Sequence, residues 1–235
     1  MRMIIAQDRS EIYYKVVGAG KTVVLIHGNF QQHRHFERQI DFFSKYYRVI
    51  AMDTRDQGKS NNRSKRLDYD LIIEDLAQIL QQENISRCAM IGFSDGANIA
   101  LSFACRYPSI VRKLVLCSGN LSFDGLVKHK QIQFKLGYLL MRYIIHWKRG
   151  YRLLSFLMKP VPIQEEDAQK LVDTEALVIV GGRDIIKQQQ TNRIVQMLPN
   201  VRFHTLLHHG HTIRTVDAAF IVDFLGRGGE SEITT

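Results

Sequence analysis

The chain has 235 residues, of which 45% are hydrophobic and 23% are charged, and its formal net charge is +9. This length and balance are ordinary for a globular protein with one sizeable core. The basic residues are spread along the chain without a basic tail or a recognisable nucleic-acid-binding module, so we expect no nucleic-acid partner. No apolar run approaches the roughly 20 residues needed to span a bilayer, and the first ten residues lack the apolar region of a signal peptide.

The three cysteines, Cys88, Cys105 and Cys117, all lie in apolar sequence context. Reduced thiols in the core are the simplest account of an odd number of cysteines in such positions, and they predict a cytoplasmic protein. None of the three belongs to a Cys-x-x-Cys pair or to a Cys/His cluster. The sequence therefore predicts no metal site.

Apolar periodicity predicts strands that alternate with helices along most of the chain. The first two strands, 3–6 and 11–17, form a predicted hairpin at a sheet edge because apolar residues alternate in the second arm. The elements that follow, in chain order, are strand 22–26, helix 36–43, strand 47–52, helix 69–83, a strand from 88 that runs directly into a helix, strand 111–117, strand 176–180, helix 188–198, strand 201–207 and helix 216–225. This alternation predicts an α/β fold with a mostly parallel central sheet and helices on both faces.

Residues 121–168 break this rhythm. They show no strand pattern, and long helical patterns with many aromatic residues take its place. We therefore predict a helical cap at 121–168, inserted into a core domain made of 1–120 and 169–235. Residues 226–235 are expected to form a frayed tail.

The sharpest motif lies where the strand from Cys88 meets the small-residue helix that follows it. Only Gly92-Phe93-Ser94-Asp95-Gly96 separates the two, which predicts a strained backbone at Ser94, with glycines two positions to either side that allow close backbone approach. The pattern favours a serine hydroxyl presented at the tip of a sheet, beside a helix N-terminus. A solvated serine in a tight glycine turn is the plainer alternative.

A nucleophilic serine needs a base, and four histidines follow the last predicted strand or lie within it. His204 falls inside the strand, and His208 and His209 precede Gly210 in the loop. His211 lies at the carboxyl end of that strand, where function collects in parallel sheets. We favour His211 as the base, with His208 and His209 as alternatives.

The base needs an orienting acid, and Asp184 follows the strand at 176–180 in the expected order after the serine and before the histidine. Asn120 and Asp124 are weaker alternatives, and a turn or N-cap role is the plainer interpretation of Asp184. The oxyanion formed during acyl transfer needs two donors. The backbone N–H of Asp95 is one candidate, and that of Asn29 or Phe30 is the other.

These motifs together resemble the α/β-hydrolase superfamily along nearly the whole chain. The matching segments are 23–30, 49–60, 90–101, 178–184 and 210–211. The resemblance implies a Ser94–Asp184–His211 triad with backbone donors at Asn29 and Asp95. The chain departs from the family at residues 55–60, where Arg-Asp-Gln-Gly-Lys-Ser stands in place of Arg-Gly-His-Gly-x-Ser.

The activity that the resemblance implies is that of a serine hydrolase similar to small carboxylesterases. Such an enzyme cleaves an ester or related acyl bond through an acyl-enzyme, without a metal or organic cofactor, and we expect its small-molecule substrate to be largely apolar. Cleavage of a thioester, lactone, peptide or carbon–carbon bond on the same triad is the alternative. A non-catalytic ligand-binding protein of this fold is the rival from another class.

The predicted cap carries the best information about partners. Between Asp124 and Glu165 there is no acidic residue and there are eight basic ones: Lys128, Lys130, Lys135, Arg142, Lys148, Arg149, Arg152 and Lys159. A basic, aromatic lid suits an apolar acyl chain, with or without a negative charge. Contact with an anionic membrane is an alternative that we do not favour, and a subunit interface is a further alternative that the sequence leaves open. We expect the apolar face of the cap to pack on the core, and we take Phe30, Phe93 and Trp147 as candidate pocket residues.

Overall fold

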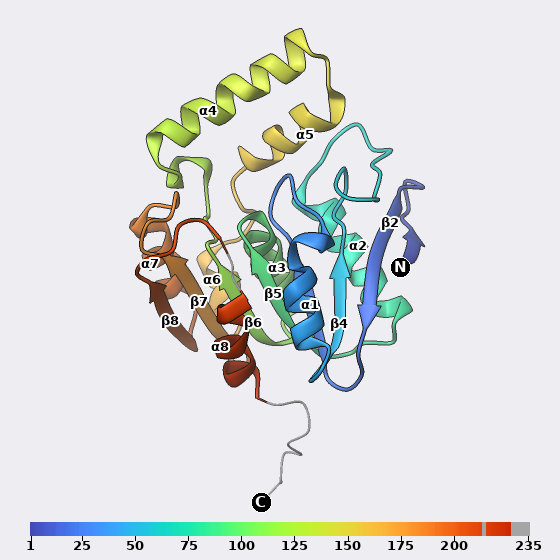
Figure 1. Cartoon of the computed structure of the whole chain (residues 1–235), viewed down its shortest axis with the longest axis vertical. Coiled ribbons are helices and arrows are strands. Elements are labelled where there is room, and N and C mark those ends of the chain that lie inside the picture. The colour runs from blue at the N-terminus through green and yellow to red at the C-terminus, as the bar shows by residue number, and fades with distance from the viewer. Residues whose placement is uncertain (213–214, 227–235) are drawn as a thin grey trace, which may run out of the picture.

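The computed structural model describes residues 1–212 and 215–226 of the chain. Within them, eight strands form one sheet in the order β1-β2-β4-β3-β5-β6-β7-β8 (Figure 1). The strands are β1 (Arg2–Ile5), β2 (Glu11–Val17), β3 (Thr22–Ile26), β4 (Arg48–Met52), β5 (Cys88–Phe93), β6 (Val111–Cys117), β7 (Glu175–Gly181) and β8 (Val201–Leu206). Every pairing from β4 to β8 in this order is parallel, whereas β2 pairs antiparallel with both β1 and β4.

Helices cover both faces of the sheet. The helical elements of the described residues are η1 (His33–Phe36), α1 (Glu37–Phe43), α2 (Tyr69–Gln82), α3 (Asp95–Arg106), η2 (Phe123–Gly125), α4 (Lys128–Leu139), η3 (Leu140–Ile144), α5 (Lys148–Leu157), α6 (Glu165–Gln169), α7 (Gln188–Met197) and α8 (Thr215–Leu225). Helices α1 and α8 pack on one face, and α2, α3, α6 and α7 pack on the other (Figure 1). The predicted α/β fold class is confirmed.

Strand β3 shows why its sequence is apolar throughout. Val23 and Leu25 pack in the cluster of α1 and α8, whereas Val24 and Ile26 point to the opposite face. All four are at most 1% exposed. A strand that is buried on both faces needs apolar residues at every position, because successive side chains alternate between the faces.

The structure refines one of the predicted elements and leaves another untested. The helix expected at 36–43 is preceded by a 3₁₀ turn, η1, so the ordered segment after β3 begins at His33. The tail expected at 226–235 lies outside the described residues except for Gly226.

Helical elements fill the chain between β6 and β7, and this segment adds no strand to the sheet. Helices α4 and α5 lie beyond the carboxyl ends of the parallel strands (Figure 1). The division into a core domain and a cap at 121–168 stays a prediction. None of the helices in the described part of the chain is long and apolar enough to cross a membrane.

Helix α5 is fastened to the loop that follows β4. The guanidinium of Arg152 is buried, forms an ion pair with Asp56, and donates to the carbonyl oxygen of Ser64 at 2.8 Å and to that of Asn62 at 3.3 Å. Arg149 donates to the carbonyl oxygen of Asp56. Buried charges are tolerated when they are paired and hydrogen-bonded, so these contacts fix α5 against the core.

Candidate active site

Ser94 occupies the sharp turn that the sequence predicted between β5 and α3. Its φ of 55° and ψ of −123° are strained for a residue with a side chain. A Cβ added to Gly92 would lie 2.2 Å from the carbonyl oxygen of Gly96, and one added to Gly96 would lie 2.0 Å from that of Ile26. The two glycines are therefore required by the close approach of neighbouring backbone, and they allow the turn that presents Ser94.

Of the four candidate histidines, His211 is the one whose ring reaches Ser94. Its Nε2 lies 2.9 Å from the Ser94 Oγ, and its Nδ1 lies 2.7 Å from Oδ1 of Asp184. His204 lies on β8 instead, where its ring packs against Phe220 with 4.7 Å between the ring centres. The loop after β8 thus brings His211 between the predicted nucleophile and the predicted acid.

The Asp184 carboxylate is held by three donors. Besides His211, Oδ2 accepts a hydrogen bond from Oγ of Ser118 at 2.6 Å, and Oδ1 accepts one from the N–H of Ile186 at 3.0 Å. Burial raises the pKa of Asp184, but these hydrogen bonds and the charge of His211 outweigh burial, and the pKa falls below its ordinary value. Asp184 is therefore ionised at neutral pH and can orient the imidazole.

Ser118 is a site residue that the sequence reasoning missed. It follows β6 directly and takes a left-handed conformation with φ of 54°. The signal that could have found it is its place at the carboxyl end of a parallel strand, next to the strand that precedes Asp184.

The two alternatives to Asp184 are occupied by other partners, although Asn120 lines the cavity at Ser94. The Asn120 amide donates to the carbonyl oxygen of Ser122 at 2.8 Å, and the Asp124 carboxylate is exposed and pairs with the Ser122 hydroxyl. Among the described residues, neither side chain forms a hydrogen bond or ion pair with His211, whose two ring nitrogens face Asp184 and Ser94.

The loop after β3 lies against Ser94, as the predicted oxyanion hole requires. A Cβ added to Gly28 would lie 3.1 Å from the Cβ of Ser94. The N–H of Phe30 already donates to the side-chain oxygen of Asn29 at 3.0 Å. In the described part of the chain the N–H groups of Asn29 and Asp95 donate to no protein acceptor, so these two remain the candidate donors.

His27 has a structural role in the same loop. Its Nε2 accepts a hydrogen bond from the N–H of Thr54 at 3.1 Å, and its Nδ1 lies 2.8 Å from the carbonyl oxygen of Gly28. Burial lowers the pKa of His27 to about 4. The ring is therefore neutral, and its two nitrogens join the loop after β3 to the loop after β4 at the carboxyl edge of the sheet.

The side chain of Asp95, beside the nucleophile, is buried and poorly satisfied. Its Oδ1 lies 3.5 Å from Nδ2 of Asn98, and its Oδ2 has no hydrogen-bond partner among the residues that the structure describes. Burial raises the pKa of Asp95 to about 6, although the nearby His211 and Asn29 partly oppose the shift. A carboxyl group under the site thus titrates near neutral pH.

A cavity of about 130 Å³ opens at Ser94. Two of the candidate pocket residues, Phe30 and Phe93, line it together with Phe134 of α4 and Leu157 of α5. Trp147 does not line this cavity. It lines an adjoining one of about 280 Å³, and its ring centre lies 6.5 Å from that of Phe30. The cavity at Ser94 is small and largely apolar.

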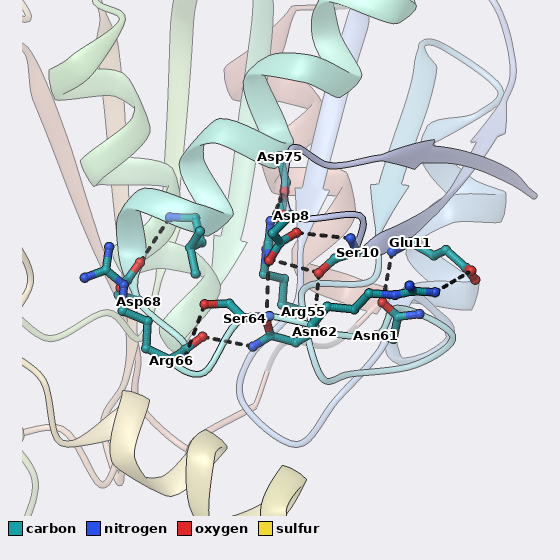
Figure 2. A network of polar contacts seen from close by, with 12 residues as sticks. Asp8, Ser10, Glu11, Arg55, Asn61, Asn62, Ser64, Arg66, Asp68 and Asp75 are labelled. Atoms are coloured by element: carbon teal, nitrogen blue, oxygen red, sulfur yellow. Dashed lines mark hydrogen bonds and ion pairs between the residues drawn. The ribbon is translucent and has the colours of Figure 1, made fainter.

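The departure from the family pattern after β4 leaves the turn intact. Asp56, where the pattern has glycine, takes a left-handed φ of 63°, and its carboxylate binds Arg152 of α5. Figure 2 shows the neighbouring Arg55, whose guanidinium binds both oxygens of Asp75 at 2.6 and 2.8 Å and Oδ2 of Asp8 at 2.5 Å. The loop is therefore held by ion pairs on both sides.

No group of three or more His, Cys, Asp or Glu side chains is arranged to hold a metal ion within the described ranges.

This fold and site are those of an α/β protein whose parallel strands deliver a serine, an acid and a histidine to one edge. A family model described as alpha/beta hydrolase fold matches residues 21–148, more than half of the chain. The chain belongs to this family and is an α/β hydrolase.

Similar curated proteins span several activities. A putative esterase/lipase of Haemophilus influenzae is 22% identical over 87% of this chain and 82% of its own length. A 2-hydroxy-6-oxononadienedioate/2-hydroxy-6-oxononatrienedioate hydrolase of Paraburkholderia phymatum is 36% identical over 46% of this chain and 40% of its own. Epoxide hydrolase 3 of Xenopus tropicalis is 27% identical over 51% of this chain, which spans only 34% of that protein.

Solved structures agree on the fold. A carboxylesterase structure from Nitrososphaera gargenis has a TM-score of 0.81 at 17% identity and covers 95% of this chain and 96% of its own. An esterase from Exiguobacterium antarcticum has a TM-score of 0.77 at 20% identity, with coverage of 95% and 98%. At identities this low, the structural similarity establishes the architecture alone, and the substrate has to be argued from the site.

Proposed function

We propose that the protein is a serine hydrolase that cleaves a carboxylic ester through an acyl-enzyme. The observation that carries the proposal is the chain of contacts from Ser94 Oγ through His211 to Asp184, at 2.9 and 2.7 Å. A nucleophile within reach of a base, which is itself oriented by an acid, is the arrangement that activates a serine hydroxyl.

In the first half of the reaction, His211 Nε2 takes the proton of Ser94 as Oγ attacks the acyl carbon. The imidazolium that forms is stabilised by the Asp184 carboxylate, which stays ionised. The developing oxyanion is held by the N–H groups of Asn29 and Asp95, and the second of these belongs to the first residue of α3, where the helix dipole favours negative charge. The imidazolium then gives its proton to the leaving alcohol.

In the second half, His211 takes a proton from water, which attacks the acyl-enzyme. The same two N–H groups hold the second oxyanion, and the carboxylic acid leaves as Ser94 regains its proton from His211. These steps use only groups of this chain, so we propose that the enzyme needs no metal or organic cofactor.

The cavity supports a small, largely apolar acyl substrate, because aromatic and aliphatic side chains line a volume of about 130 Å³. Lactone and carbon–carbon bond cleavage on the same residues are the second candidates, since structures similar to this chain include an enol-lactonase from Burkholderia xenovorans and relatives include the Paraburkholderia hydrolase. We place the enzyme in the cytoplasm on the basis of its cysteines in apolar contexts.

Labelling by a fluorophosphonate probe tests the proposal. The wild-type protein and Ser44→Ala, a control serine at the end of α1, should both be labelled, whereas Ser94→Ala should not. Turnover of a short-chain aryl ester should fall by about 10⁴-fold or more in His211→Ala and by about 10⁴-fold in Asp184→Asn. Equal labelling of wild type and Ser94→Ala, or of neither, would contradict the proposal.

A further inference from the structure

The outer face of the cap is apolar and open to solvent. No residue of α4 is buried. Six large apolar side chains of α4 and its continuation η3 are between 44% and 72% exposed, and we call them the outer stripe: Ile132, Leu136, Leu139, Leu140, Tyr143 and Ile144. The expectation that the apolar residues of the cap pack on the core is wrong for these residues.

The opposite face of α4 is already occupied. Phe134 lines the cavity at Ser94, and the Tyr138 ring lies edge-on to Tyr151 of α5 with 6.5 Å between the ring centres. A Cβ on Gly137 would lie 3.4 Å from Leu154. Helix α4 is therefore apolar on two opposite faces, of which one packs against α5 and the other is the outer stripe. A contiguous exposed apolar surface marks an interaction site.

A basic row runs beside the outer stripe. Lys128, Lys135 and Arg142 are exposed and recur at intervals of seven residues, which places them on one side of the helix. Lys148, also exposed, begins α5. Because no acidic residue lies between Asp124 and Glu165, this positive charge is uncompensated within the segment.

We propose that the outer stripe and the basic row dock on the surface of an anionic lipid bilayer. An apolar face beside a row of Lys and Arg side chains is the arrangement of a helix that lies in the membrane interface, with the apolar side chains among the acyl chains and the cations at the headgroups. The helical segment 128–144 provides both features along its length.

A second copy of this chain fits the surface less well. Two outer stripes packed face to face would bring the basic rows of both copies together, with no acidic residue of either segment to neutralise them. Anionic headgroups supply the missing negative charge.

The proposal goes beyond the proposed hydrolysis and does not depend on the role of Ser94. It adds a position for the cap: the docked α4 lies between the bilayer and the cavity, because Phe134 lines that cavity from the inner face of the same helix.

Cosedimentation of the full chain with vesicles tests the docking. The wild-type protein should bind vesicles that contain phosphatidylserine in low salt, and it should bind pure phosphatidylcholine vesicles far less. High salt should release it because the headgroup charge is then screened.

Two cap variants separate the contributions. Lys128→Gln/Lys135→Gln/Arg142→Gln should lower the partition coefficient by on the order of 100-fold, and Leu136→Ser/Ile144→Ser should lower it by on the order of tenfold or more. The charge-matched control is Lys21→Gln/Lys45→Gln/Arg87→Gln, whose exposed residues precede β3, β4 and β5 at the opposite edge of the sheet. The apolar control is Val172→Ser, which replaces a side chain that is 60% exposed. Both controls should bind as wild type does.

Three outcomes would overturn the proposal. The wild-type protein fails to bind phosphatidylserine vesicles in low salt, the cap variants bind as well as the controls, or sedimentation velocity shows a dimer that Leu136→Ser/Ile144→Ser dissociates. Thermal unfolding followed by circular dichroism should give the same midpoint for the cap variants and wild type, because the replaced side chains are exposed. Loss of vesicle binding at an unchanged midpoint is therefore loss of the docking surface. The same preparations should keep fluorophosphonate labelling of Ser94, which separates failure of the docking from failure of the proposed hydrolysis.

Discussion

Helices α4 and α5 are neighbours in the cap and have similar basic and apolar composition, yet α5 directs such side chains toward the core and α4 directs them toward solvent. In α5, Arg152 is buried against the core, and Leu153, Leu154 and Phe156 are buried with it. In α4 and its continuation η3, the basic row and the outer stripe face solvent. The difference shows that a basic amphipathic sequence does not determine whether its charged side chains face the core or the solvent. Their orientation depends on whether the core offers a partner. Asp56 and loop carbonyls bind the arginines of α5, and α4 has no such partner among the described core residues.

The largest contrast should come from the arginines. Arg152→Met leaves the Asp56 carboxylate without its cation and two loop carbonyls without donors, so we expect the free energy of unfolding to fall by about 3–5 kcal/mol. Arg142→Met, its counterpart in η3, the continuation of α4, should change it by less than about 0.5 kcal/mol. Urea unfolding of the two variants measures both values. Similar losses would mean that α4 is also anchored.

Replacing one leucine in each helix should show the same contrast between α5 and α4, with a smaller loss of stability. Leu153 is 2% exposed, whereas Leu136 is 60% exposed. Leu153→Ala should lower the free energy of unfolding by about 2–4 kcal/mol through lost burial and a residual cavity, and Leu136→Ala should leave it nearly unchanged. Urea unfolding measures both values. A Leu153→Ala variant as stable as wild type would contradict the expectation and show that α5 is dispensable for the core.

A pH-dependent effect is expected at Asp95, the buried first residue of α3. Because the pKa of Asp95 is raised to about 6 in the folded state, folding binds a proton there, and its ionisation destabilises the fold as pH rises from about 4 to about 6. Asp95→Asn should remove this contribution and stabilise the protein by about 3 kcal/mol above that range and little below it. The difference between variant and wild type isolates Asp95 from Asp75, whose pKa burial also raises to about 6. A difference that does not change with pH would refute the expectation.

The smallest effect should come from the link between α5 and the candidate oxyanion loop. The Asn29 amide donates to the carbonyl oxygen of Leu153 at 2.8 Å. Asn29→Ala keeps the backbone N–H but frees the loop, so we expect about 1 kcal/mol of lost stability and a kcat lowered about tenfold with little change in KM. Ester kinetics test this, and a change confined to KM would assign Asn29 to substrate binding alone.

Much of the candidate site could be predicted because each of its parts carries a local signal. Ser94 lies between obligatory glycines, and Asp184 and His211 each follow a recognisable strand. The parallel sheet brings such strand ends to one edge whatever the lengths of the connections. The α/β fold followed from the same alternation.

The cap could not be predicted to the same depth. Helix α4 is apolar on two faces, and periodicity cannot say which of them packs inward, so both the place of Trp147 and the exposure of the outer stripe depended on tertiary packing. Ser118 was not predicted for a related reason. Its contact with Asp184 joins residues from the ends of two neighbouring strands, and no spacing in the sequence indicates such a contact.

The attachment of α5 also bears on how freely the loop after β4 can vary. Arg149 and Arg152 donate to the carbonyl oxygens of Asp56, Gly58, Asn62 and Ser64. Every residue has a carbonyl, so these acceptors survive replacement of the side chains at 62 and 64. Asp56 is the exception, since its carboxylate also takes part. The attachment of α5 to this loop therefore depends on the path of the backbone and on the Asp56 carboxylate, whereas the ion pairs of Arg55 with Asp8 and Asp75 set a separate limit on the loop's sequence.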